Sequence, residues 1–571
     1  MTSTDASATV ASEGASPWRG APVPSGGIAE LLEWRATHEG DQPFVKCSAQ
    51  WRTFGDVEAA AERLACGIAR LGVRKGDRVG VIADNRDELI DLFFACSKLG
   101  VIGVSFNTFL KGDFLSYQLA DADLSLIVVD APGFRALSAV FGQAGVRTVV
   151  TLDEVTEGGL PGSEVHRFAD VANGPLGREP VAVSAGDLQA ILYTSGTTGA
   201  PKGCMLPHGY FRYAPTQYFL DERIVPGDLI FCSYPFFHTS AQVYVLMLAL
   251  SGPCSLRITT SFSASRFMEQ ARAEGATRIV GVAAMAAAVL AQPEKPEDAD
   301  PGSIRSAFFV PFSEHDQLEF ERRFGIPTFG EGFGQTECMP ICHASLRGPR
   351  KRNSNGLPVS HFDLAILADD GSEVPRGTVG EICVRPRLPN VMYQGYWRKP
   401  AATLENMQHY WHHTGDYGRQ DEDDFVYFVD RKKQAIRRRG ENISSLEVEA
   451  AIRKHPSVRD VAVHAVPSPL GEDDVKAVLV LVSRGDVTVQ PGELFRFFCD
   501  ALPYFAVPRY VEIRHSLPVN ALGRVMKHIL REEGITPATW DLEALGFIIT
   551  KDERRLPYRR PRYWPSRLCS D

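Results

Sequence analysis

The chain has 571 residues, of which 44% are hydrophobic and 23% are charged, and its net charge is −9. This length exceeds what one hydrophobic core serves, so we expect a globular protein of several subdomains. The negative charge argues against a nucleic-acid-binding protein, whose surface would be basic. Since no apolar run of about 18 residues is present, we also expect no membrane span.

Residues 1–25 are rich in Ser, Ala, Gly and Pro, and we expect them to be disordered. They lack the basic start and apolar core of a signal peptide. The eleven cysteines are scattered, which is typical of free thiols and predicts a cytoplasmic location. Cys338, Cys342 and His343 form the closest group. Without a second ligand pair at a suitable spacing, idle thiols are favoured there over a metal site.

From residue 28 to about 350, helical and strand-like patterns alternate. We expect helices over 28–37, 54–71 and 88–99, and strands over 78–83, 124–129, 146–152 and 188–192. This order predicts an α/β fold with largely parallel sheets. From 356 to 391 the apolar runs shorten and turns become frequent, which predicts a small β-barrel-like piece.

The pattern changes again near residue 432. Helices expected over 446–454 and 491–501, with strands over 458–466 and 474–482, predict a small α+β domain. We divide the chain into a disordered segment (1–25), a large N-terminal domain of two α/β subdomains and a small β-barrel (26–431), a small mobile C-terminal domain (432–548) and a basic tail (549–571). The tail is expected to be a solvated extension, with docking as the alternative.

A loop rich in hydroxyl side chains follows the strand expected at 188–192. Residues 193–203 read YTSGTTGAPKG and combine these hydroxyls with three glycines and Lys202. Backbone N–H groups, hydroxyls and one cation in a single loop suit a polyphosphate. The spacing is not that of a Walker loop, in which four residues separate the first glycine from Gly-Lys-Ser/Thr. A flexible linker is the alternative, but a linker needs neither the preceding strand nor the final Pro-Lys-Gly.

Further segments follow along the chain. They are 235–238 (PFFH), 332–337 (GFGQTE), 412–416 (HHTGD) leading into 430–433 (DRKK), and 439–449 (RGENISSLEVE). With the loop, they resemble the signature segments of the adenylate-forming superfamily, which includes acyl-CoA synthetases, stand-alone adenylation enzymes and firefly luciferase. The resemblance covers residues 28–545. The wording of 437–449 is most similar to carnitine- and crotonobetaine-type CoA ligases.

The resemblance implies an acyl-CoA ligase that works in two steps. A carboxylate attacks the α-phosphate of Mg-ATP, which gives an acyl-adenylate and pyrophosphate. The small domain then rotates, and the thiol of CoA displaces AMP. The implied cofactors are ATP or a preformed acyl-AMP, CoA and Mg²⁺, and the substrate is expected to be a hydrophobic carboxylic acid or its adenylate.

The resemblance also assigns the nucleotide-binding residues. The residues predicted to bind the phosphates are Thr194, Ser195, Gly196, Thr197, Thr198, Gly199 and Lys202. Glu337 is predicted to bind Mg²⁺, and Thr336 is predicted to contact the α-phosphate. Gly332 and Phe333 are predicted to contact the adenine, and Phe333 replaces the tyrosine that is usual in the family. Asp416 is predicted to accept hydrogen bonds from the ribose hydroxyls, with Arg431 nearby. The alternatives are a surface carboxylate for Glu337 and a helix or turn cap for Asp416.

The acyl and CoA parts of the site follow in the same way. His238 corresponds to a gate between acyl pocket and phosphates, with a packed core histidine as the alternative. Lys433 corresponds to the hinge of the small domain. Gly440 corresponds to the pantetheine tunnel, because a residue without Cβ permits close approach. The basic run 437–439, which includes Arg439, either meets the phosphates of CoA or is solvated. The acyl pocket is expected between His238, the segment 281–285 and Phe333.

Two positions depart from the family pattern. Arg524 stands where the family carries a lysine that bridges the carboxylate and the α-phosphate during adenylation. Arginine keeps the charge, but its planar fork is not a compact ammonium, and losing one preorganised donor costs about 10²–10³ in rate. Lys527 is not expected to substitute for it. At 308–312 (FFVPF), bulky residues replace a common glycine pair and reshape the wall beside the adenine and the acyl group.

The sequence therefore predicts a ligase whose adenylation half is weak or lost and whose thioester half is intact. Such an enzyme would use adenylate from a separate adenylating enzyme. Two alternatives remain, an adenylation enzyme that loads a carrier protein and a non-catalytic nucleotide-binding relative. The sequence does not encode the oligomeric state, although the homodimer is the commonest oligomer.

Overall fold

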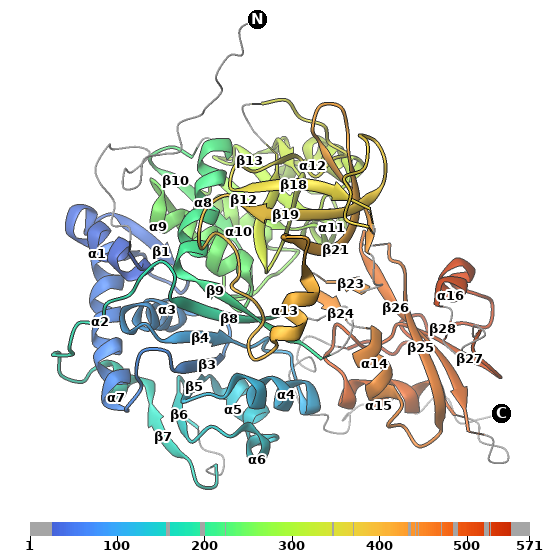
Figure 1. Ribbon diagram of the computed structural model, residues 1–571, viewed down its shortest axis with the longest axis horizontal. Coiled ribbons are helices and arrows are strands. Elements are labelled where there is room, and N and C mark those ends of the chain that lie inside the picture. Colours follow the sequence, from blue (N-terminus) through green and yellow to red (C-terminus); the bar gives the residue numbers. More distant parts are fainter. Residues whose placement is uncertain are drawn as a thin grey trace, which may run out of the picture.

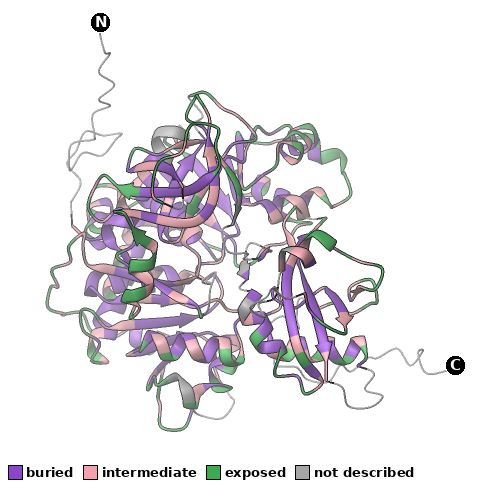
Figure 2. Ribbon diagram, turned by 45° about the vertical axis from the view of Figure 1, so that its right-hand side comes forward, coloured by how far each residue is buried: buried purple, intermediate pink, exposed green. Residues whose placement is uncertain are grey.

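The structure is a computed structural model that describes residues 26–155, 160–194, 200–222, 224–344, 348–368, 370–431, 436–439, 441–443, 445–469, 471–482, 489–518, 525 and 527–549. Figure 1 shows a large N-terminal body and a smaller C-terminal body, drawn in orange and red, at its side. The sheets are largely buried, whereas the outer helices carry exposed residues (Figure 2). No helix among the described residues is long and apolar enough to cross a bilayer.

The first sheet of the large body is parallel except for its last strand, which turns back antiparallel. Its seven strands lie in the order β7 (Glu164–Arg167), β6 (Thr148–Thr151), β5 (Leu126–Val129), β3 (Arg78–Ile82), β4 (Ile102–Ser105), β8 (Leu188–Thr194) and β9 (Lys202–Pro207). All four residues of β5, LIVV, are buried. Continuous apolar runs of this kind are typical of parallel strands covered on both faces.

The second sheet repeats this plan. Its seven strands lie in the order β14 (Thr328–Phe329), β13 (Ser306–Val310), β12 (Arg278–Val282), β10 (Asp228–Cys232), β11 (Cys254–Ile258), β1 (Pro43–Lys46) and β2 (Arg52–Thr53). The strands are parallel except for the pair β1 and β2. The chain returns to this sheet after building the first one, so β1 lies beside β11 although more than 200 residues separate them.

Helices connect and cover the two sheets. They are α1 (Ile28–Glu39), α2 (Phe54–Arg70), α3 (Asp87–Leu99), α4 (Gly112–Ala122), α5 (Ala131–Ser138), α6 (Phe141–Ala144), α7 (Phe168–Ala172), α8 (His208–Glu222), the π-helix η1 (Ser240–Leu246), α9 (Met247–Ser251), α10 (Phe267–Ala273), α11 (Ala283–Leu290), the 3₁₀ turn η2 (Pro296–Ala299) and α12 (Glu314–Phe324). Helix α2 begins where Thr53 and Asp56 form a reciprocal capping box. The helices expected over 28–37, 54–71 and 88–99 are confirmed as α1, α2 and α3.

A β-rich piece follows the second sheet. It contains a three-stranded sheet of β15 (Gly332–Gln335), β16 (Cys338–His343) and β17 (Leu357–Pro358), and a five-stranded sheet of β18 (Phe362–Leu367), β19 (Gly380–Pro386), β20 (Met407–Gln408), β21 (Trp411–Gln420) and β22 (Val426–Arg431), with α13 (Pro400–Asn406) beside it. The pairs between β18, β19, β21 and β22 are antiparallel. The prediction of a small barrel-like piece is therefore confirmed as a half-barrel.

The C-terminal body is an α+β unit with its own hydrophobic core. It consists of the hairpin β23 (Ile436–Arg438) and β24 (Glu441–Ile443), α14 (Ser445–Ile452), β25 (Val458–Pro467), β26 (Asp473–Leu481), α15 (Pro491–Ala501), β27 (Tyr510–Arg514), α16 (Lys527–Glu533) and β28 (Trp540–Asp541). The predicted fold class is confirmed. The boundaries at 26–431 and 432–548 stay predictions, and the hinge residue Lys433 and the segments 1–25 and 550–571 lie outside the described residues.

The contact between α2 and α7 yields a test of this packing. A Cβ at Gly67 would overlap the carbonyl oxygen of Val171, which is backbone and cannot rotate away. We expect Gly67→Ala to lower stability by about 1–3 kcal/mol, as overpacking does, and to lower the midpoint of thermal unfolding. Gly142→Ala is the matched control, because a Cβ there meets nothing within 4 Å in helix α6. Equal midpoints for the two variants would contradict the close approach.

Candidate active site

The predicted phosphate loop lies between two paired strands. In the antiparallel register of β8 and β9, Thr194 pairs with Lys202, so both ends of the loop are fixed opposite each other. The Thr194 hydroxyl donates to the carbonyl oxygen of Lys202 at 3.4 Å. Five predicted phosphate ligands, Ser195, Gly196, Thr197, Thr198 and Gly199, lie outside the described residues. The structure thus describes the two anchors of the loop.

Tyr396 contacts both Lys202 and Glu337, the predicted magnesium ligand. The ammonium of Lys202 lies 4.8 Å from the centre of the Tyr396 ring, and the Tyr396 hydroxyl donates to Oε1 of Glu337 at 2.7 Å. Burial and the Glu337 carboxylate raise the pKa of the Tyr396 hydroxyl, so it remains a donor. Asn406 donates to the same hydroxyl at 3.0 Å. Glu337 is buried, so it is not the surface carboxylate that the sequence left open.

Asp416 is fixed by an amide from the neighbouring sheet. Gln335 on β15 donates from Nε2 to Oδ2 of Asp416 at 2.8 Å and to the carbonyl oxygen of Thr414 at 2.7 Å. Asp416 is 4% exposed and lies opposite Arg431 in the register of β21 and β22. The side chain of Arg431 is outside the described part of the chain. Sequence reasoning did not single out Gln335, because only the tertiary fold brings β15 next to β21.

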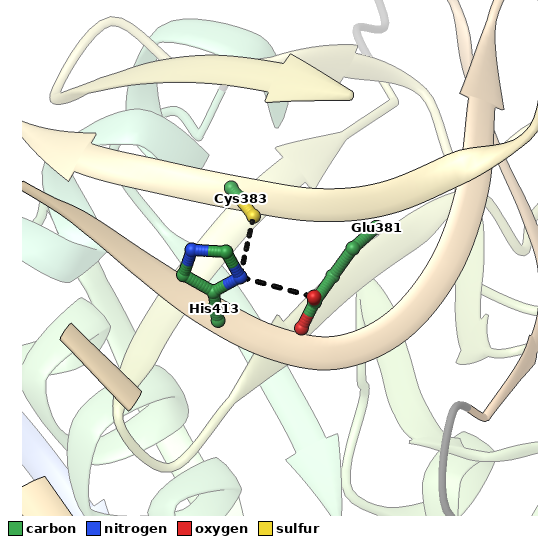
Figure 3. Close-up of side chains that lie close together, drawn as sticks. All are labelled: Glu381, Cys383 and His413. Atoms are coloured by element: carbon green, nitrogen blue, oxygen red, sulfur yellow. Dashed lines mark hydrogen bonds and ion pairs between the residues drawn. The ribbon is translucent and has the colours of Figure 1, made fainter. Parts of the chain in front are cut away.

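The side chains of Glu381 and Cys383 on β19 and of His413 on β21 lie close together (Figure 3). Oε2 of Glu381 lies 3.0 Å from Nδ1 of His413, and Oε1 of Glu381 accepts the Gly415 N–H at 3.0 Å. Gly415 has φ +73°, a left-handed conformation that favours glycine. Glu381 therefore fixes the turn that presents Asp416, and sequence reasoning missed it.

The same three side chains are the one set in the described ranges whose ligand atoms lie close enough to share a metal ion. The group that the sequence offered as a conceivable metal site, Cys338, Cys342 and His343, is not brought together in this way. Cys338 and Cys342 are both buried, and burial raises the pKa of each thiol above its ordinary value. They are buried thiols in β16, as the sequence favoured.

The predicted adenine and α-phosphate residues lie on and after β15. The Phe333 ring lies 6.3 Å from the ring of Phe428 on β22. The carbonyl oxygen of Thr336 accepts the Tyr210 hydroxyl at 3.3 Å. A Cβ at Gly332 would lie 3.2 Å from the Val310 side chain and 3.6 Å from the Phe308 ring. The bulky residues of 308–310 thus pack against Gly332.

The Phe308 ring also contacts two other aromatic side chains. Its ring stacks on the His343 ring at 5.0 Å and lies 6.0 Å from the Tyr244 ring of η1. The Tyr234 hydroxyl donates to the carbonyl oxygen of Gly281, at 2.9 Å, in the segment expected to line the acyl pocket. The π-helix that carries Tyr244 begins two residues after His238 and was not anticipated from the sequence.

His238 contacts the small domain. Its Nε2 lies 3.1 Å from Oε1 of Glu441, which belongs to β24. Asn107 of the large domain donates from Nδ2 to the same oxygen at 3.1 Å. The His238 side chain is 36% exposed, so it is not the packed core histidine that the sequence left as an alternative. Sequence reasoning quoted Glu441 within its segment but gave it no role, and it missed Asn107.

A cavity of about 80 Å³ lies between the two domains at this contact. Its lining includes Asn107, Thr194 and His238 from the large domain, and Glu441, Glu447 and Phe505 from the small domain. Burial raises the pKa of Glu447 to about 8, so its carboxyl group is mostly neutral at neutral pH. The cavity therefore reaches from the phosphate-loop anchor to the gate residue and the small-domain hairpin.

The basic run at 437–439 is not a uniform solvated patch. Arg438 is 5% exposed, pairs with Asp474 at 2.8 Å and donates to the carbonyl oxygen of Val507 at 2.6 Å. Burial, with Arg439 nearby, lowers its pKa to about 10. Arg439 lies 5.5 Å from the Tyr504 ring and 3.5 Å from Glu543. Gly440, between Arg439 and Glu441, lies outside the described residues.

Lys527 is fixed within the small domain. Its ammonium donates to the Ser445 hydroxyl at 2.8 Å and pairs with Oε1 of Glu449 at 2.6 Å. The expectation that Lys527 does not substitute for the lysine missing at position 524 stays a prediction. Arg524 itself lies outside the described residues.

Known proteins resemble this chain over most of its length. The AMP-binding enzyme family matches residues 32–397, and the AMP-binding enzyme C-terminal domain matches residues 447–524. A crotonobetaine/carnitine–CoA ligase from Salmonella heidelberg is 30% identical over 499 residues, which cover 86% of this chain and 95% of that protein.

Two solved structures of one Bacillus subtilis enzyme are also similar. A double mutant of o-succinylbenzoate CoA synthetase, bound with its product analogue OSB-NCoA, has a TM-score of 0.75 and 26% identity. The complex of this enzyme with AMP has a TM-score of 0.62 and 25% identity. Each comparison covers 88% of this chain and 98% of the other. The chain therefore belongs to the AMP-binding enzyme family of the adenylate-forming superfamily and is an acid–thiol ligase of the acyl-CoA synthetase type.

Proposed function

We propose that this ligase makes the CoA thioester of a hydrophobic carboxylic acid and is specialised for the second half-reaction, from acyl-adenylate to thioester. The observation that carries this proposal is the contact of Glu441 with His238 and Asn107, which closes the small domain over the predicted site. Arg524 at the adenylation-lysine position is the reason to expect a weak first half. A separate adenylating enzyme would then supply the adenylate, and we propose a cytoplasmic location.

The two Bacillus subtilis structures support this reading of the domain arrangement. They share one enzyme and one coverage of this chain, yet the TM-score is 0.75 with the CoA product analogue and 0.62 with AMP. The higher score belongs to the complex with the thioester product analogue, and we take this as support for a thioester-forming arrangement of the domains.

The described residues fit the nucleotide roles proposed for them. Glu337 would hold Mg²⁺ through a carboxylate oxygen, as expected for a metal that also keeps substrate phosphate and water as ligands. The ion, when bound, neutralises charge on the phosphates. Lys202 would contact the phosphates, Thr336 the α-phosphate, Gly332 and Phe333 the adenine, and Asp416 the ribose hydroxyls, where a charged acceptor makes stronger hydrogen bonds than a neutral one. Gly440 would line the path of the pantetheine arm.

The proposed acid is hydrophobic because aromatic rings form the wall beside Gly332. Phe308, Tyr244 and the face of His343 supply apolar surface there, and ligand pockets of apolar molecules are lined in this way. CoA remains the proposed acceptor, but Arg438 gives no support to it, because its guanidinium is engaged with Asp474. The buried, oriented carboxylates of Glu337 and Asp416 argue against a non-catalytic relative.

The first test gives the purified protein two alternative inputs with CoA. One is a chemically made acyl-adenylate, and the other is the matching free acid with Mg-ATP. We expect thioester from the adenylate at a rate well above that from the free acid, measured by chromatography of acyl-CoA. Equal rates would show a complete two-step ligase and contradict the weak adenylation half. A carrier protein acylated in place of CoA would identify the other acceptor, and no product from either input would contradict the ligase function.

Arg524→Lys tests the cause of the weak first half. Restoring the compact ammonium should raise acid-dependent pyrophosphate release by about 10²–10³, the usual value of one preorganised transition-state donor. Arg459→Lys, at an exposed position of the same domain, is the control and should change the rate less than twofold. A gain with neither variant would mean that Arg524 is not what limits adenylation.

Asp416→Asn tests the nucleotide site. The variant keeps the shape of the side chain but removes the charge that Gln335 orients. We expect AMP to bind about 10–100-fold more weakly by calorimetric titration, because hydrogen bonds to charged groups contribute about 1.5–3 kcal/mol. Asp363→Asn, which removes a surface carboxylate paired with Arg385 on the same half-barrel, should leave binding unchanged. Wild-type affinity in Asp416→Asn would exclude the ribose role.

A further inference from the structure

We propose that Glu441 and His238 form a general-base dyad for the acceptor thiol, assembled only when the small domain occupies the position described here. The inference rests on the ligase function proposed above and adds a catalytic role for His238 and a positioning role for Glu441. The two residues are 203 positions apart in the chain and come from different domains. Neither role follows from the local sequence around either residue.

The orientation of Asn107 fixes the chemistry of the contact. Oδ1 of Asn107 accepts the Phe109 N–H at 2.9 Å, so the amide nitrogen is the atom that faces Glu441. Oε1 of Glu441 therefore accepts a hydrogen bond from Asn107 and lies 3.1 Å from Nε2 of His238. The Glu441 side chain is 14% exposed, so it is held away from bulk water.

This arrangement selects one tautomer of His238. A neutral imidazole has one N–H and one acceptor nitrogen, and an N–H directed at a carboxylate is favoured over two facing lone pairs. Nε2 of His238 therefore donates to Glu441, and Nδ1 is left as the acceptor. An imidazole oriented by a carboxylate through one nitrogen and basic at the other is the arrangement of a catalytic triad.

The proposed base lies at the cavity between the two domains, where we propose that the acceptor thiol binds. His238 and Glu441 both line the interdomain cavity of about 80 Å³, whose lining also includes Thr194 at the phosphate-loop anchor. Glu447 is the other carboxyl group in this lining, and burial raises its pKa to about 8. A carboxyl group that is mostly protonated cannot accept the proton of a thiol, which leaves His238 as the base at neutral pH.

The proposed step transfers the acyl group from the adenylate to the acceptor thiol. The acceptor is an alkyl thiol, which is mostly protonated at neutral pH, whereas the thiolate is the nucleophile. The thiol proton moves to Nδ1 of His238 while the sulfur attacks the carbonyl carbon of the acyl-adenylate. The carbon–sulfur bond forms, the bond from this carbon to the phosphate oxygen breaks, and AMP leaves with the electron pair. Glu441 stabilises the imidazolium until its proton passes to water.

The dyad makes general-base catalysis by His238 depend on the position of the small domain. Glu441 is contributed by the small domain, so its support of His238 is lost whenever that domain moves away. The general base is then complete only in the arrangement that performs the thioester step.

Single-turnover thioester formation from a chemically made acyl-adenylate tests the dyad. Glu441→Gln keeps the shape and an accepting oxygen but cannot stabilise an imidazolium, so we expect the rate with CoA to fall about 10–100-fold. His238→Gln should lower it at least as much. The double variant should be no slower than His238→Gln alone, because residues that act as a unit are not additive.

The acidity of the acceptor separates catalysis from positioning. The same reaction is run with N-acetylcysteamine and with the more acidic 2,2,2-trifluoroethanethiol, which is more ionised and needs the base less. The loss in Glu441→Gln should shrink for the acidic thiol. An equal loss with both thiols, or additive effects in the double variant, would overturn the dyad and leave only a structural contact.

Asp113→Asn is the matched control. Asp113 pairs with Lys454 across the same domain contact but does not contact His238. It should change the rate less than twofold, because exposed ion pairs contribute little. Unchanged AMP binding in Glu441→Gln confirms that the variant is folded. Wild-type protein that forms no thioester from adenylate would refute the ligase function itself, whereas active wild type with an unaffected Glu441→Gln refutes only the dyad.

Discussion

The carboxylates of the predicted site lie largely out of contact with water, so each of them needs a hydrogen-bond donor. Neutral donors meet this constraint. A phenol orients Glu337, an amide orients Asp416, and a second amide orients Glu441. A buried carboxylate without a hydrogen-bond partner would be costly, whereas a neutral donor satisfies one oxygen and adds no opposing charge. Gln335 comes from β15, whereas Tyr396 and Asn107 lie in connections outside the named strands.

The half-barrel shows how far this arrangement extends. The two carboxylate oxygens of Glu381 contact Nδ1 of His413 and the Gly415 N–H. These contacts fix the backbone directly before Asp416. Gln335 reaches the same residue from another sheet. The position of Asp416 therefore depends on the pairing of β19 with β21 and on the neighbouring β15.

Glu441 makes one of the described contacts between the two domains. Besides the contact with His238 and Asn107, the Phe109 ring lies 4.5 Å from the Tyr504 ring, and Asp113 pairs with Lys454. Each domain has its own core. Bodies with separate cores are compatible with domain movement, and the proposed dyad would couple the position of the small domain to the state of His238.

The sequence by itself determined the secondary-structure elements, the α/β class and the family. Apolar periodicity places α1, α2, α3 and the strands β3, β5, β6 and β8 of the first sheet, because it depends on neighbours a few residues away. The order of the five signature segments identifies the superfamily. Sequence reasoning left the alternatives for Glu337, Asp416 and His238 open, and it grouped Arg438 with a basic run that could be solvated. The tertiary structure excludes a surface carboxylate for Glu337, a packed core histidine for His238 and a solvated Arg438, since burial and hydrogen-bond partners depend on strands brought together by topology. The role of Asp416 stays a prediction. The pairing of Arg438 with Asp474, of Gln335 with Asp416 and of His238 with Glu441 joins residues 36 to 203 positions apart, and no local pattern encodes such distances.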